Sequence, residues 1–276
     1  MSEKGSTGSL FVVSTPIGNM GDFSFRAVET LRSVALILAE DTRHSRPLLE
    51  KHDIKTRLAS YHEHNEARSI AGIIERLQQG DDIALISDAG TPLLSDPGER
   101  LVRAATEAGI TVVPVPGASA LLAALVASGL PTERFAFYGF PPRKGRERTQ
   151  LLDEIASSPM TAVLYEGPGR VADTLRDLAE RAPGRETVVA RELTKQFEEF
   201  RRGTLEALSA YYDETPPRGE VVIMIAGASP TTPDEAALRT DAAALRADGL
   251  SVRDTVAQLV KRGAPRNLAY KLASER

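Results

Sequence analysis

An acidic loop follows directly on a short apolar run in the first third of the chain. The run Ile83–Ile86 predicts a buried strand, which continues without a break into SDAGTPLLSDPG (87–98). This loop contains two carboxylates, Asp88 and Asp96, and no lysine. A loop that binds phosphate offers backbone N–H groups at a helix N-terminus, usually beside a lysine and with little negative charge nearby. The acidic loop therefore suits a ligand that carries hydroxyls, an amine or another cation, and no phosphate.

S-adenosylmethionine (SAM) meets this description, because it is a nucleoside with a sulfonium and an ammonium group and without phosphate. Neither GNMG (18–21) nor AGTP (89–92) has the GxGxxG spacing of a dinucleotide site, and no Walker sequence occurs. The alternative is that the two aspartates are turn and N-cap residues, with Pro97 at the first helical position. We expect this structural role for Asp96 and a ligand-facing role for Asp88.

Two further loops are expected beside the acidic loop. In PVPGASA (114–120), Pro116 and Gly117 force a turn, and the small residues leave the backbone open to a flat group such as adenine. A tight strand-to-helix connection with Ser119 as N-cap explains that loop equally well. The loop TPIG (15–18) follows another short strand. Because the carboxyl ends of parallel strands gather at one edge of a sheet, where α/β folds bind ligands, the three loops should meet there.

Basic runs follow the strands of the second half of the chain. PPRKGRER (141–148) carries four basic residues, and Arg170 and RELTK (191–195) also come just after predicted strands. A basic run is usually only a solvated face, but three of them opposite an acidic ligand loop indicate a polyanionic substrate. His62 and His64 suggest a metal site at first sight, but no further histidine lies near, so we expect no metal.

The composition limits the class of protein. The 276 residues carry a formal net charge of −4, so any basic surface must be local. There are no cysteines, which excludes disulfides, thiolate metal sites and a cysteine nucleophile, and fits a cytoplasmic protein. No apolar run approaches the roughly 20 residues that a membrane span needs, so we expect no membrane association.

Short β-rich runs alternate with helical patterns over residues 10–129, which predicts βαβ units and a mainly parallel sheet. After a break at 129–131 the alternation restarts, with strands expected at 135–138, 162–165, 187–190 and 221–226. We therefore expect a disordered tail over 1–9 and α/β domains over 10–129 and 130–228. A linker and a small helical region should occupy 229–276.

Several of these motifs together resemble the tetrapyrrole methylase superfamily, and within it the group that 2′-O-methylates a decoding-centre cytidine of 16S rRNA. The segments that carry the resemblance are STPIGN (14–19), AEDTR (39–43), HNE (64–66), SDAGTPLLSDPG (87–98), PGASA (116–120), GF (139–140), YE (165–166) and RELTK (191–195). They occur in order over nearly all of residues 10–226. The last residues resemble the small helix-turn-helix-like region of the same group.

The resemblance implies two α/β domains with SAM in the cleft between them, and a homodimer that acts on 16S rRNA or the 30S subunit. The cofactor-binding residues that we expect are Pro16, Asp88, Gly90, Thr91, Pro92, Leu94, Ser119, Ala120, Tyr165, Leu193 and Ala226. The residues expected to hold RNA phosphates are Arg43, Arg143, Lys144, Arg170 and Arg191. We expect Arg170→Ala to weaken RNA binding while SAM binding stays intact. The family's usual His-Arg after Tyr-Glu is here Gly169-Arg170, so any role of that histidine is absent or moved.

The implied reaction is an in-line attack of a ribose 2′-oxygen on the sulfonium methyl, which orientation and desolvation accelerate. The hydroxyl still needs a base. Glu166, Glu40 or a Lys195 of depressed pKa would serve, and the sequence does not choose among them. We predict Glu166 and Lys195 as the catalytic residues.

Two other functions stay open on the sequence alone. One is a methylase that acts on a tetrapyrrole or another small molecule with the same fold. The other is a non-catalytic RNA-binding or ribosome-assembly factor that keeps a relic SAM pocket. The basic loop at 143–148 and the helical tail favour RNA, and the intact pocket loops favour catalysis.

Overall fold

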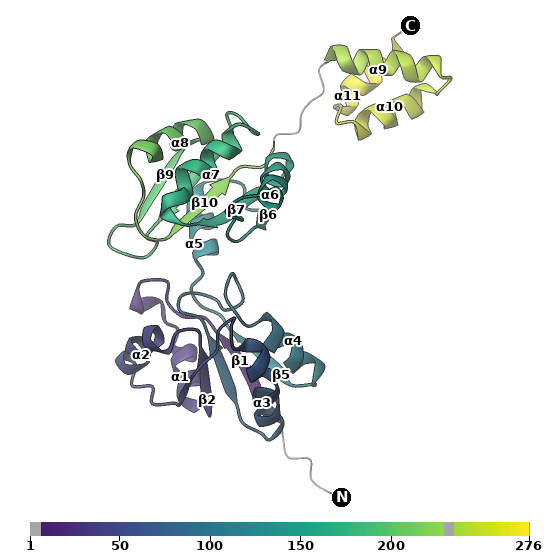
Figure 1. The fold of residues 1–276 in the computed structure, drawn as a ribbon. Coiled ribbons are helices and arrows are strands. Elements are labelled where there is room, and N and C mark those ends of the chain that lie inside the picture. Colours follow the sequence, from purple (N-terminus) through teal and green to yellow (C-terminus); the bar gives the residue numbers. More distant parts are fainter. Residues whose placement is uncertain (1–6, 229–234, 276) are drawn as a thin grey trace, which may run out of the picture.

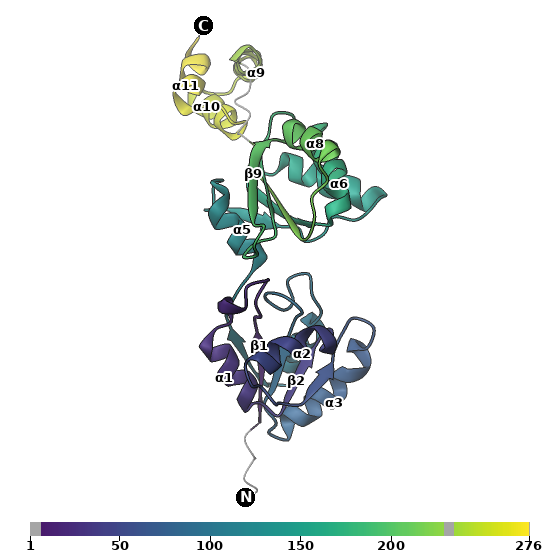
Figure 2. The ribbon, with the colours of Figure 1, turned by 90° about the vertical axis from the view of Figure 1, so that its left-hand side faces the viewer.

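The computed structural model describes residues 7–228 and 235–275, which form two α/β domains and a group of three helices (Figure 1, Figure 2). This confirms the expected fold class. Residues 1–6 of the expected disordered tail and 229–234 of the expected linker lie outside the described residues, and Ser9 already belongs to the first strand. Within the described part of the chain, no helix is both long and apolar enough to cross a membrane.

The first domain is a five-stranded parallel sheet with helices on both faces. Its strands are β1 (Ser9–Val13), β2 (Leu36–Ala39), β3 (Leu58–Ser60), β4 (Ile83–Ile86) and β5 (Thr111–Val115), in the order β3-β2-β4-β1-β5. The short helix η1 (Met20–Asp22) and the helices α1 (Phe25–Ser33), α2 (Thr42–Lys51), α3 (Glu66–Gln78) and α4 (Glu99–Glu107) connect them. Every strand pair is parallel, as the alternating pattern predicts.

The central strands of this sheet are apolar without interruption because both of their faces are covered. In β2, Leu36 and Leu38 pack with α3 and α4, whereas Ile37 and Ala39 pack with α1 and α2 on the other face. All four residues are buried. The loops at the carboxyl ends of β1, β2, β4 and β5 are therefore built on a rigid support.

The second domain has a mixed sheet. Its strands are β6 (Phe135–Phe137), β7 (Thr161–Glu166), β8 (Glu186–Arg191), β9 (Glu199–Thr204) and β10 (Val221–Ile225), in the order β6-β7-β10-β8-β9. The helices α6 (Arg146–Ser157), α7 (Val171–Ala179) and α8 (Leu205–Glu214) cover one face, and η2 (Pro168–Arg170) precedes α7. Only β6 and β7 are parallel. Strand β10 runs antiparallel to both of its neighbours, and β8 and β9 are also antiparallel. Strand β9 was not predicted, because its sequence EFRRGT is charged and occupies an edge.

Helix α5 (Ala120–Ser128) joins the two domains. It precedes the boundary expected at 129/130, yet Leu121 and Leu125 pack on the second sheet, against β7, β8 and β10. Arg202 of β9 donates to the carbonyl oxygens of Ala127 (2.6 Å) and Ser128 (3.0 Å) at the end of the helix. In Figure 1, α5 accordingly lies between the two sheets.

The last part of the described chain consists of α9 (Glu235–Ala247), α10 (Val252–Lys261) and α11 (Arg266–Ser274). These helices enclose a small core of their own, which includes Leu238, Leu259 and Leu272. They stand apart from the two sheets in both views (Figure 1, Figure 2).

Candidate active site between the domains

A cavity of about 330 Å³ lies between the carboxyl edge of the first sheet and the second domain. Its volume is within the range of small-molecule sites. The lining residues of the first domain and of α5 are Ile17, Asp88, Ala89, Gly90, Thr91, Leu94, Ser95, Asp96, Ser119 and Ala120. Those of the second domain are Phe140, Tyr165, Glu166, Gly167, Pro168, Leu193, Gly219, Glu220, Val221 and Val222.

The three loops that were expected to meet at the sheet edge do meet there. Thr15 and Gly90 exchange two backbone hydrogen bonds, of 2.8 and 3.1 Å, so the loop after β1 pairs with the acidic loop after β4. The Thr91 hydroxyl then lies 2.9 Å from that of Ser14 and donates to the carbonyl of Ala118 at 3.1 Å. These bonds join all three loops into one wall of the cavity.

Strained backbone is concentrated in two cavity loops. Among the described residues other than glycine, five have a positive φ, and four of these lie in the segments 93–95 and 192–194. They include Leu93 (φ 73°) and Ser95 (φ 71°), which turn the acidic loop across the cavity. Such conformations cost free energy and cluster at ligand sites, so their placement here supports a binding role for both loops.

The charges of the cavity wall match a cationic ligand. Four carboxylates line it, and the lining residues include no lysine, arginine or histidine. Glu166 and Glu220 are paired with Arg170 and Lys195 from behind the wall, whereas Asp88 and Asp96 have no ion pair within the described residues. A phosphate would be repelled in this site, whereas a sulfonium or an ammonium group would be attracted. The residues present therefore fit SAM, as the sequence predicted.

Asp96 does not have the helix-starting role expected from the sequence. The N-cap of α4 is Gly98, at φ 133°, and no side chain caps this helix. Asp96 lines the cavity instead. Burial is the main cause that raises the pKa of Asp96, and the nearby Glu40 raises it further. A hydrogen bond with Ser87 partly offsets them, and the resulting pKa is about 6. The sequence signal was ambiguous, because Asp-Pro is also a common helix start.

Most of the expected cofactor residues line the cavity. They are Asp88, Gly90, Thr91, Leu94, Ser119, Ala120, Tyr165 and Leu193. Pro16, Pro92 and Ala226 do not line it; Pro16 and Pro92 are buried, and their sequence neighbours Ile17 and Thr91 line the cavity instead. The lining residues that sequence reasoning missed include Ile17, Ser95, Asp96 and Phe140, which lie in the recognised motifs, and the segment 219–222, which lies outside them.

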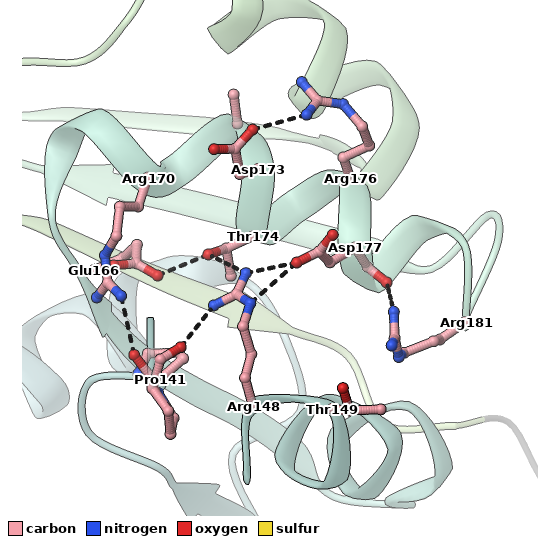
Figure 3. A network of polar contacts seen from close by, with 12 residues as sticks. Pro141, Arg148, Thr149, Glu166, Arg170, Asp173, Thr174, Arg176, Asp177 and Arg181 are labelled. Carbon is pink, nitrogen blue, oxygen red and sulfur yellow. Dashed lines mark hydrogen bonds and ion pairs between the residues drawn. The ribbon is translucent and has the colours of Figure 1, made fainter. Parts of the chain in front are cut away.

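Glu166 belongs to a buried polar network beside the cavity (Figure 3). Its Oε1 accepts from the backbone N–H of Gly167 at 2.8 Å and forms an ion pair with Arg170, and its Oε2 accepts from the Thr174 hydroxyl at 2.7 Å. Arg170 also donates to the carbonyl of Pro141 at 3.1 Å. Both carboxylate oxygens of Glu166 are thus occupied, which leaves this group poorly placed to accept a proton.

Lys195 connects the two domains. Its Nζ lies 3.1 Å from Glu192 and 2.9 Å from Glu220, and its aliphatic part covers Gly18, where a Cβ would approach it within 2.6 Å. Burial alone would lower the pKa of Lys195, but the hydrogen bonds with Glu220 and Glu192 outweigh it and raise the pKa. The depressed pKa that a lysine base needs is therefore absent.

The five expected RNA-binding residues differ in availability. Arg170 is held by Glu166, and Arg191 lies 2.7 Å from Glu199. Arg43 is exposed but pairs with Asp41 at the start of α2. Arg143 and Lys144 are exposed, and within the described residues their side chains have no hydrogen bond or ion pair. No group of three or more potential metal ligands occurs in the described part of the chain.

The family model for Tetrapyrrole (Corrin/Porphyrin) Methylases matches residues 9–209. The chain belongs to this family. Within the family, the chain is 48% identical over 273 residues to "Ribosomal RNA small subunit methyltransferase I" of Synechocystis sp., covering 97% of this chain and 98% of that protein. It is 51% identical over 225 residues to the protein of the same name from Pseudomonas aeruginosa, covering 80% of each. The resemblance to the tetrapyrrole methylases, and within them to ribosomal RNA small subunit methyltransferases, is thereby confirmed.

Two solved structures share the fold of this chain. Diphthine synthase superposes with a TM-score of 0.63 at 16% identity, covering 79% of this chain and 90% of that chain. A uroporphyrin-III C-methyltransferase of Thermus thermophilus, in complex with S-adenyl homocysteine, gives a TM-score of 0.57 at 19% identity and covers 79% and 97%. At these identities the likeness establishes the arrangement of two α/β domains.

Proposed function

We propose that this methylase uses SAM to methylate small-subunit ribosomal RNA, at the ribose 2′-oxygen of a cytidine in the decoding centre of 16S rRNA. The observation that carries the proposal is the acidic cavity, which suits a cationic cofactor and repels phosphate, with unpaired basic residues on the adjoining loop at 143–144. The names of the two curated relatives, which cover most of the chain, support the ribosomal substrate.

SAM supplies a methyl group that is already activated by its sulfonium. The backbone of the Gly90 turn and the apolar side chains of Leu94 and Leu193 would enclose it, and Asp88 and Asp96 would face its cationic groups. Water exclusion and orientation are then the main contributions of the protein. Bound SAM would supply this methyl to the ribose oxygen and keep the electron pair of the broken C–S bond on sulfur, and a base of the protein would take the hydroxyl proton.

Of the three candidate bases, Glu40 is the one that is not held in an ion pair in the described part of the chain. It follows β2 at the same sheet edge as Asp88, whose Oδ1 accepts from the backbone N–H of Asp41 at 3.0 Å. Within the described residues the Glu40 carboxylate has no hydrogen-bond partner. Burial raises the pKa of Glu40, and Asp88 raises it further, while His62 lowers it by a smaller amount. The raised pKa brings this carboxylate nearer to the range of an effective base.

Methyl transfer provides the direct test of this function. The protein with labelled SAM should label the RNA of 30S subunits that lack the modification, and nuclease digestion should recover the label on a ribose of one cytidine. Label on a base would contradict the proposed acceptor atom. Label on a tetrapyrrole and not on RNA would favour the small-molecule alternative, and SAM binding without any transfer would favour an assembly factor.

We further propose that the protein acts as a homodimer. Helix α5 is apolar on all sides, as a helix buried throughout would be, yet Leu122 is 50% exposed and Val126 is 75% exposed. A second copy of the chain would cover this face. Analytical ultracentrifugation should therefore give the mass of a dimer, and a monomer at micromolar concentration would contradict the proposal.

A further inference from the structure

The loop between β6 and α6, together with the first turn of α6, presents three cations to solvent. Residues 141–148 carry four basic side chains and one acidic side chain, Glu147. Arg143, Lys144 and Arg146 are exposed, and their side chains have no hydrogen bond or ion pair within the described residues. Cations that are not paired within the protein are available to an anionic partner.

The fourth basic residue of this segment, Arg148 in the first turn of α6, has a different role. Its side chain is only 12% exposed and contacts Asp177 at 2.7 Å. It also donates to the Thr174 hydroxyl at 3.2 Å and to the carbonyl of Pro142 at 3.1 Å. Thr174 in turn donates to Glu166 in the cavity wall, so one chain of hydrogen bonds runs from the wall to the loop (Figure 3).

The loop is held at two successive carbonyls. Arg170 binds that of Pro141 and Arg148 binds that of Pro142, and both arginines are fixed by buried or partly buried carboxylates (Figure 3). Such charge-assisted bonds are stronger than neutral ones and restrict the loop geometry. The cations at 143, 144 and 146 are therefore presented from a fixed backbone.

An exposed aromatic ring lies between this loop and the cavity. Phe140 directly precedes Pro141, lines the cavity and is 54% exposed. Its ring meets that of Tyr165 edge-on, with centroids 5.6 Å apart, which leaves much of Phe140 open to solvent. Proteins that bind single-stranded nucleic acid combine cations for the backbone with aromatic rings on which bases stack.

We propose that Phe140, Arg143, Lys144 and Arg146 form a docking surface for a single-stranded RNA segment at the cavity mouth, and that Arg148 and Thr174 position it. The inference rests on the proposed function and specifies how the RNA is held. RNA is favoured over an acidic peptide because an exposed ring beside the cations offers a stacking platform for a base.

Binding of a fluorescein-labelled 12-nucleotide unstructured RNA, followed by anisotropy, tests the surface. Replacement of Arg143, Lys144 and Arg146 by alanine should weaken binding at least about tenfold and lower the salt dependence, since about 0.7 counterions are released per neutralised phosphate. Phe140→Leu should weaken binding about fivefold with an unchanged salt dependence, because stacking involves no charge.

The positioning role is tested with two matched pairs of variants. Arg148→Gln should weaken RNA binding about fivefold and lower its salt dependence, whereas Arg176→Gln, which removes an equal charge from an exposed pair on α7, should not. Thr174→Val should act like Arg148→Gln, and Thr174→Ser should restore binding because it keeps the hydroxyl. Melting curves show whether a variant binds RNA weakly only because less of it is folded. In that case the folded fraction would still show the wild-type salt dependence of RNA binding.

The outcomes separate this inference from the proposed function. If subunits are methylated normally while all loop variants bind the RNA as the wild type does, the docking surface is wrong and the function stands. If polyglutamate binds this surface as tightly as the RNA does, the partner of the surface is an acidic protein and not RNA. If the loop variants lose RNA binding but the wild type methylates no ribosomal RNA, the function fails and the surface stands.

Discussion

Binding of SAM is expected to weaken as the pH falls through about 6, and Asp96→Asn should remove most of this dependence. Burial and the nearby Glu40 raise the pKa of Asp96 to about 6, so this carboxylate is ionised at neutral pH and protonated below. The protonated group no longer attracts the cationic cofactor. A charge-assisted hydrogen bond contributes about 1.5–3 kcal/mol, so the variant should bind SAM roughly 10- to 100-fold more weakly at pH 7.5.

Calorimetric titration of the protein with SAM between pH 5 and 8 measures this effect. The charged groups that face Asp96 are Glu40 and Asp88, which both raise its pKa, whereas a hydrogen bond with Ser87 lowers it. Glu99→Gln, which removes an exposed carboxylate from the first turn of α4, is the matched control and should bind SAM normally. An affinity that is independent of pH in the wild type would show that Asp96 does not contact the cofactor.

The same substitution should stabilise the protein without cofactor. The folded pKa of Asp96, about 6, lies above its unfolded value of 3.8, so the stability it contributes is present below about pH 4 and is lost as the pH rises through 6. Asp96→Asn should therefore raise the melting temperature at pH 7 and change it less at pH 4. A site that is strained until its ligand binds commonly behaves in this way.

Arg170→Ala is expected to destabilise the protein by about 3 kcal/mol, because removing one partner of a buried ion pair leaves the other charge without compensation. Glu166 is only 2% exposed, and Arg170 is the one cation that the described residues place on its carboxylate. The sequence had suggested a selective loss of RNA binding. The structure indicates that folding and the cavity wall would be affected first.

Urea unfolding followed by circular dichroism measures this loss. The double variant Glu166→Gln/Arg170→Met should recover most of the stability, since it removes the unpaired charge. Arg176→Ala, whose partners Asp173 and Asp213 are exposed, should cost less than about 1 kcal/mol. A change for Arg170→Ala as small as that for Arg176→Ala would mean that Glu166 finds other compensation.

Local patterns in the sequence were sufficient to predict the first domain and the three cavity loops. The apolar runs of β2 and β4 are continuous because these strands are buried on both faces, and Gly90 marks a turn that requires φ of 85°. Parallel strands then bring the loops to one edge. The absence of a lysine in the acidic loop was enough to argue against phosphate.

Features that depend on distant contacts could not be predicted in this way. The apolar pattern of α5 does not say which sheet it covers, and the charged strand β9 pairs only because β8 offers an edge. Both Asp96 and Gly98 could precede the first turn of α4 in the sequence, and the structure has Gly98 at the N-cap. Close packing there requires a glycine, because a Cβ at Gly98 would meet Leu85 within 2.6 Å. Similarly, Arg148 and Arg170 have the sequence context of surface cations, but buried partners hold them.

The strand orders of the two sheets also determine when each can close during synthesis. In the first sheet the strand β1, which lies between β4 and β5, is made first and waits for both neighbours, the last of which ends at Val115. In the second sheet the central strand β10 is made last, so β6–β7 and β8–β9 remain two separate pairs until Ile225 has been added. A nascent chain therefore exposes apolar strand edges over a long interval, during which non-native pairing competes with folding.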